Sequence, residues 1–157
     1  MKISRFFLSL ENICDILPEE IPGQLEGDAH MPRTAQAQKA VSKAQVLTKA
    51  LINSATCLEI SKTRLAHILG VSGATVTRLY SDGYLLSPGK KEWDFAVLMV
   101  RLFRSLDSIV GGSVEDARKW LASENMALAG RKPAELIEST EGLVRVVTYL
   151  DACRAVI

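Results

Sequence analysis

The chain has few of the residues on which catalytic and metal sites depend. Its 157 residues include two histidines, His30 and His67, and three cysteines. It contains no glycine-rich phosphate loop, no Cys-x-x-Cys pair and no arrangement of a nucleophile with a base. These absences favour a protein that is not an enzyme and holds no metal or cofactor, and they leave His67 as an ordinary surface or core side chain.

The chain also lacks paired cysteines and long apolar runs. Cys14, Cys57 and Cys153 are odd in number and widely spaced, which argues against a disulfide framework and is typical of a reducing compartment. The N-terminal apolar run is short and broken, and the run over residues 95–100 ends at Arg101. Neither a signal peptide nor a membrane span is therefore expected, and we expect a cytoplasmic protein with no membrane partner.

Charge is nearly balanced overall but unevenly distributed. The formal net charge is +1. Residues 1–30 carry two basic and six acidic side chains, whereas residues 60–91 carry five basic side chains and one acidic, Asp82. This separation favours one anion-binding face in the basic segment.

Helical periodicity runs through most of the chain, and sustained alternation of apolar and polar residues is absent, so we expect an all-α fold. Residues 4–17 predict an amphipathic helix and residues 18–28 an acidic, turn-rich linker. Met31 is either an alternative translation start or the junction with an added N-terminal segment. Residues 36–55 predict a further helix, whose inward face is Leu47, Ala50, Leu51 and Ala55, with Val46 at its edge.

Residues 62–83 carry the most informative pattern, two short helices joined by a tight turn. Gly70 ends the first helix, because glycine adopts the left-handed conformation at little cost. Ser72 can cap the second helix, and two apolar residues three positions apart face inward from it. This spacing resembles the helix-turn-helix of phage-repressor-type regulators at four positions, Ala66, Gly70, Val76 and Leu79.

That resemblance implies that the second helix enters the major groove of DNA. Its expected outward side chains are short hydroxyls, an alanine and an arginine: Ser72, Ala74, Thr75, Thr77 and Arg78. Alanine or a threonine methyl can contact a thymine methyl, and Arg78 can reach guanine or a phosphate. Basic residues around the motif suit phosphate contacts: Lys62, Arg64, Lys90 and Lys91. The alternative is an ordinary helical hairpin with solvated basic side chains.

The segment after the motif predicts a long helix over residues 93–110 that is apolar almost all round. Such a helix is buried on more than one side, so it is either the centre of a larger core or a dimer interface. Its expected main face is Trp93, Ala96, Val97, Val100, Phe103 and Leu106. The pair Gly111 and Gly112 ends this helix.

Three shorter helices are expected after that break. Ser113 starts one in which Ala117, Trp120 and Leu121 share a face, so that we expect Trp120 in the core. Pro133 begins a second that runs to Ile137. Ser139 or Thr140 caps the last helix, whose inward residues are Leu143, Val146, Val147 and Leu150.

This second half resembles the toxin-binding domain of Xre/ParS-type antitoxins. The matching positions are Trp120, Leu121, Asn125, Leu128, Gly130, Pro133, Leu136, Ile137 and Gly142. With the upstream motif, the resemblance covers residues 40–157; Lys132 departs from it, because a serine or threonine cap is expected there. The resemblance implies an antitoxin that blocks a RES-domain, NAD-degrading toxin and represses the shared operon. The residues that we expect to bind the toxin are Tyr149, Arg154 and Ile157.

The expected organisation has three parts. Residues 1–35 form an extension and linker, residues 36–92 a helix-turn-helix DNA-binding domain, and residues 93–157 a small helical domain for dimerisation and toxin binding. The expected partners are a RES-domain toxin, operator DNA and a second copy of the chain. The alternative is a stand-alone dimeric transcriptional repressor with no toxin partner, which the neighbouring reading frame would distinguish.

Overall fold

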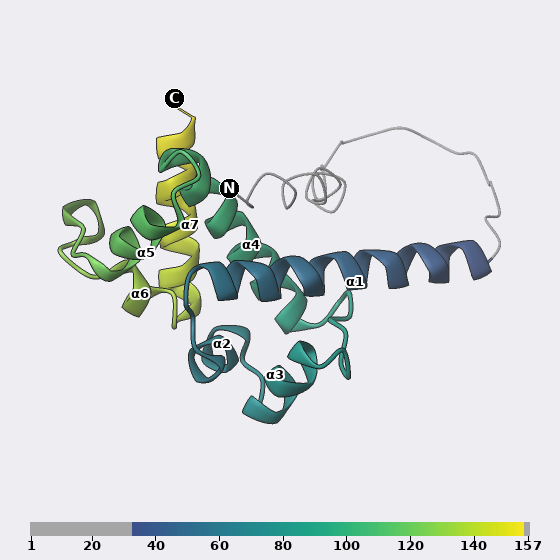
Figure 1. Cartoon of the computed structure of the whole chain (residues 1–157). Coiled ribbons are helices and arrows are strands. Elements are labelled where there is room, and N and C mark those ends of the chain that lie inside the picture. Colours follow the sequence, from purple (N-terminus) through teal and green to yellow (C-terminus); the bar gives the residue numbers. More distant parts are fainter. Residues whose placement is uncertain (1–32, 156–157) are drawn as a thin grey trace.

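The computed structural model describes residues 33–155, and these residues form an all-helical fold (Figure 1). The expected helix over residues 4–17, the linker that follows it and Met31 lie outside the described residues. The helices are α1 (Arg33–Cys57), α2 (Lys62–Leu69), α3 (Gly73–Tyr80), α4 (Lys91–Ile109), α5 (Val114–Ala122), the 3-10 turn η3 (Met126–Leu128), α6 (Pro133–Leu136) and α7 (Thr140–Arg154). The predicted all-α class is confirmed.

The long helix α1 provides one wall of the core. The predicted inward residues Leu47, Ala50, Leu51 and Ala55 are all buried, which confirms the expected face. Thr48 is buried as well, and its Oγ1 accepts the backbone N–H of Leu86 at 3.1 Å. This bond ties the segment between α3 and α4 to α1. In Figure 1 the N-terminal end of α1 projects beyond the other helices.

Helix α4 lies at the centre of the core and packs against α1, α2, α5 and α7. Three residues of its expected face are buried (Ala96, Val100 and Leu106), and three are only partly buried (Trp93, Val97 and Phe103). Met99 and Leu102 lie outside that face and are fully buried as well, so the expected burial of this helix on more than one side is confirmed. Neighbouring helices cover α4 on more than one side, so the buried arc is wider than a single apolar stripe.

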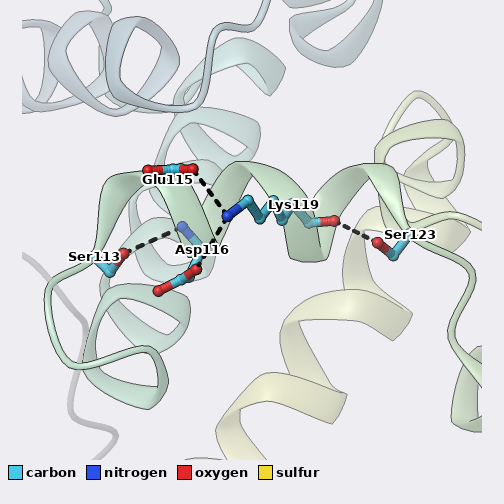
Figure 2. Close-up of polar contacts among 5 residues, drawn as sticks. All are labelled: Ser113, Glu115, Asp116, Lys119 and Ser123. Carbon is cyan, nitrogen blue, oxygen red and sulfur yellow. Dashed lines mark hydrogen bonds and ion pairs between the residues drawn. The ribbon is translucent and has the colours of Figure 1, made fainter.

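Polar contacts between neighbouring residues stabilise α5 along its exposed side (Figure 2). Ser113 caps the helix as predicted, since its Oγ accepts the backbone N–H of Asp116 at 3.2 Å. Lys119 Nζ lies 2.8 Å from Glu115 Oε1 and 3.8 Å from Asp116 Oδ1, and Ser123 Oγ donates to the Lys119 carbonyl oxygen at 2.7 Å. The two acidic residues lie in the first turn, where the helix dipole favours negative charge.

The junction of α6 and α7 is tight. Lys132 precedes α6 without a side-chain capping bond, as its departure from the expected residue predicts. Ser139, rather than Thr140, caps α7 and accepts the Gly142 N–H at 3.1 Å. At Gly142 a β-carbon would overlap the backbone carbonyl of Leu136, so only glycine fits without a shift. The predicted inward face of α7 is confirmed by the burial of Leu143, Val146, Val147 and Leu150.

Candidate functional sites

Helices α2 and α3 form the predicted helix-turn-helix. Gly70 ends α2 in the left-handed conformation, with φ +65°, and Val71 N–H donates to the Ala66 carbonyl oxygen at 3.0 Å. Ser72 caps α3 by accepting the Thr75 N–H at 3.2 Å. Val76 and Leu79 are fully buried beneath α3. The local geometry that the sequence predicted at the turn is therefore confirmed.

The inward residues of α3 determine which side chains face outward. Ser72, Ala74, Thr77 and Arg78 are exposed, whereas Thr75 is half-buried. The Ser72 and Thr75 hydroxyls lie 3.0 Å apart, which places both at the cap of the helix. Contact of Ser72 and Thr75 with bases stays a prediction, but the structure gives their hydroxyls a partner within the protein.

Two of the expected phosphate-binding residues already have partners. Lys62 Nζ lies 4.9 Å from the centre of the Tyr80 ring, a cation–π contact that joins α2 to the end of α3. Arg64 Nε lies 2.6 Å from Glu138 Oε1, in the turn between α6 and α7. Lys62 remains an exposed cation beside α3. The ion pair with Glu138 partly neutralises Arg64 and so competes with a phosphate for it.

Lys90 and Lys91 lie at the start of α4, and both are exposed. Lys90 Nζ lies 5.9 Å from the centre of the Tyr84 ring and 4.0 Å from Glu92 Oε1. Tyr84 donates its hydroxyl proton to the same carboxylate oxygen at 2.8 Å, which raises the pKa of the tyrosine. The backbone N–H of Glu92, and then Tyr84, lower the pKa of the Glu92 carboxyl. The carboxylate therefore stays charged at neutral pH and orients the chain entering α4.

A shallow groove of about 420 Å³ runs between α2 and α3. Its polar lining includes Lys62, Thr63 and His67 from α2, and Gly73 and Thr77 from α3. His67 is exposed, as the surface interpretation predicted. The groove joins the basic residues of α2 to the outward face of α3, so one continuous surface carries both.

The expected toxin-binding residues lie toward the C-terminal end of α7. Tyr149 is half-buried and stacks on Trp120 of α5, with ring centres 6.3 Å apart and planes 9° from parallel. The expected place of Trp120 in the core was wrong in part: the side chain is only partly buried and packs against the edge of the core, because it is shared between two helices. Arg154 is exposed in the last turn of α7. Ile157 lies outside the described residues.

A polar network fixes this end of α7 to α4. Ser105 Oγ, which is buried, donates to Asp151 Oδ1 at 2.7 Å, and Arg101 Nη2 lies 2.6 Å from Asp151 Oδ2. Asp151 thus belongs to the folded part of the helix. The periodicity of the sequence did not identify it, because its partners lie on a different helix.

Two ion pairs join the halves of the chain. One is the contact between Arg64 and Glu138 described above. In the other, Arg118 of α5 pairs with Glu59 at 2.7 Å and donates from Nε to the Cys57 carbonyl oxygen at 2.7 Å. No local sequence signal predicts either pair, since each joins residues far apart in the chain. Even so, α3 and the C-terminal end of α7 lie at opposite ends of the molecule (Figure 1).

No helix among residues 33–155 is long and apolar enough to cross a membrane. The family model described as the antitoxin Xre-like helix-turn-helix domain matches residues 37–101. The model described as the antitoxin Xre/MbcA/ParS C-terminal toxin-binding domain matches residues 105–155. Among curated proteins, no sequence matches the chain. The first match contains all of α2 and α3, and the second contains α5 to α7, so the chain belongs to the Xre/ParS-type antitoxins.

Proposed function

We propose that this antitoxin inhibits a RES-domain, NAD-degrading toxin in the cytoplasm and represses its own operon as a homodimer through α2 and α3. The observation that carries the proposal is the pairing of a complete helix-turn-helix with a toxin-binding domain in one chain. The separation of α3 from the C-terminal end of α7 supports a chain that can bind DNA and toxin with different surfaces. The proposal gives the chain no catalytic role.

Repression by a dimer follows from the size of the recognition element. Helix α3 has eight residues, so one copy can contact only a few base pairs. Two copies related by a two-fold axis would bind half-sites about one helical turn apart, which is the geometry of a palindromic operator. Sedimentation equilibrium on the free protein and on its complex with promoter DNA tests the dimer. A single chain per operator would contradict it.

Toxin inhibition is assigned to the C-terminal end of α7 and the residues after it. Arg154 is exposed in the last turn of that helix, where a charged side chain can enter a partner's cleft. Tyr149 contributes a half-buried aromatic ring of the kind common at interface hot spots.

The structure shows how a truncation must be designed to test this assignment. A deletion that begins at residue 151 removes Asp151, and with it the contacts to Ser105 and Arg101. Loss of inhibition would then have two causes, a missing tail and a loosened α7. A deletion of residues 152–157 keeps Asp151 and its contacts, and removes only the last three residues of α7 with the residues that follow it.

The test is co-expression of the chain with the toxin encoded by the neighbouring reading frame. We expect growth rescue by the full chain and by Tyr149→Phe, which keeps the ring stack, but not by the deletion of residues 152–157. Thermal unfolding and promoter binding of the deletion should match those of the full chain. Rescue by the deletion would refute the assignment of the tail. Promoter binding without any protection from the toxin would favour the stand-alone repressor.

A further inference from the structure

The outward face of α3 is defined by the residues buried beneath it. Val76 and Leu79 have no exposed surface, and the exposed residues Ala74, Thr77 and Arg78 are spaced three and four positions apart. Residues with this spacing lie on one face of a helix. The outward face of α3 thus presents the side chains of one alanine, one threonine and one arginine to a binding partner.

The hydroxyl groups of α3 are already used within the protein. Thr77 Oγ1 donates to the Gly73 carbonyl oxygen at 3.0 Å, so its proton is not free for a base. The Thr75 hydroxyl lies 3.0 Å from that of Ser72 at the cap, and Thr75 is half-buried. The apolar groups in the middle of the outward face, which can meet the methyl group of a base, are the Ala74 β-carbon and the Thr77 γ-methyl.

Close approach of this face to a surface is sterically open. Gly73 begins α3 and is exposed, and beyond its chain neighbours and the backbone of its own helix nothing lies within 4 Å of the position that a β-carbon would take. The start of α3 therefore has no side chain ahead of Ala74 that would hold a partner surface away from the helix. Short contacts between methyl groups need an approach of this kind.

We propose that α3 reads thymine methyl groups with Ala74 and Thr77, beside a guanine bound by Arg78. Thymine is the base that presents a methyl group in the major groove, and arginine binds the O6 and N7 acceptors of guanine. Thr75 and Ser72 are positioning residues that hold the first turn of α3. This inference rests on the proposed DNA binding and deepens it, since it names the chemical groups that the operator must offer.

The test begins by selecting operator duplexes from a random library with the full-length protein. Each thymine of the selected half-site is then replaced singly by uracil, which keeps the base pair and removes only the 5-methyl group. We expect about fourfold weaker binding at the thymine that meets Thr77, which corresponds to the loss of about one buried methyl-sized group. The thymine that meets Ala74 should show a similar loss.

Two substitutions at Thr77 identify the group that makes the contact. Thr77→Ser keeps the hydroxyl and its bond to Gly73 but removes the γ-methyl; it should bind the thymine operator about fourfold more weakly. On the uracil operator Thr77→Ser and the wild type should bind equally, because the methyl pair is already lost. Thr77→Val keeps the shape without the hydroxyl and should retain full affinity. Thr148→Ser, on the exposed face of α7, is the control and should change nothing.

The possible outcomes separate this inference from the proposed function. If the protein selects an operator but Thr77→Ser loses the same factor on thymine and uracil duplexes, methyl recognition is overturned and DNA binding stands. The same holds if Thr77→Val binds weakly and Thr77→Ser binds like the wild type, since the hydroxyl would then be the contact. If no duplex is selected, both this inference and the DNA-binding half of the proposed function are overturned. Unfolding curves of the three variants should overlay that of the wild type.

Discussion

Replacing Gly142 by alanine should destabilise the C-terminal half, although alanine normally favours a helix. A β-carbon at this position would lie 2.7 Å from the Leu136 carbonyl carbon and 2.8 Å from Ser139 Oγ, and closer still to the Leu136 oxygen. Two of these atoms belong to the backbone, so relief requires α6 to move away from α7. Ser139 would move with it, and that residue caps α7.

The expected size of the effect follows from three contributions. Overpacking of this kind costs about 1–3 kcal/mol. Disturbing the Ser139 cap adds about 1 kcal/mol. Replacing glycine by alanine within a helix returns about 0.5–1 kcal/mol. The net loss should be about 1–3 kcal/mol, which for a chain of this size lowers Tm by about 2–12 °C.

Gly73 offers a matched control, because it too lies in the first turn of a helix. A β-carbon there would meet no atom within 4 Å, and the residue has no positive φ. Gly73→Ala should therefore stabilise the fold by about 0.4–1 kcal/mol. Both variants are compared with the wild type by denaturant and thermal unfolding, followed by circular dichroism. A Gly142→Ala variant as stable as the wild type would refute the close approach of α6 to α7.

Four further predictions concern single side chains. Burial raises the pKa of the Asp107 carboxyl on α4, so Asp107→Asn should raise Tm at neutral pH. The difference in Tm between variant and wild type should shrink as the pH falls through that raised pKa, because the wild-type carboxyl then becomes neutral. Glu138→Gln releases Arg64 and should strengthen binding to operator and random DNA alike. In filter binding, the plot of log binding constant against log salt concentration should be steeper by about one. Val147→Asp buries an unpaired charge and should remove the cooperative unfolding of the C-terminal half; wild-type stability would show that the register of α7 is wrong. Arg78→Ala should weaken operator binding by about 1–3 kcal/mol with little effect on random DNA, whereas an equal loss on both would make Arg78 a phosphate contact.

The features that the sequence predicted well are those decided by neighbours along the chain. The turn at Gly70, the cap at Ser72 and the inward pair Val76 and Leu79 depend on spacings of a few residues, and all are confirmed. The apolar stripe of α7 is confirmed for the same reason. A single amphipathic face that packs on one core leaves a clear periodic signal.

The features that the sequence did not predict depend on contacts between distant residues. Burial of α4 on more than one side was expected, but the complete burial of Met99 and Leu102 depends on the positions of the helices that surround it. The Arg64 guanidinium was expected to meet phosphate, yet it pairs with Glu138 from another part of the chain. The sequence identified Gly142 only as a position that matches the antitoxin pattern, since only the fold brings the Leu136 carbonyl against it. The division of the chain at residue 92 stays a prediction.

The central claim is that one chain inhibits a toxin and binds its operator with separate surfaces. The measurement that tests it most directly is NAD breakdown by the toxin of the neighbouring reading frame, in the presence of an equimolar amount of this chain, with and without operator DNA. We expect NAD breakdown to be suppressed equally in both conditions. Continued breakdown without DNA, or its recovery when operator DNA is added, would contradict the account.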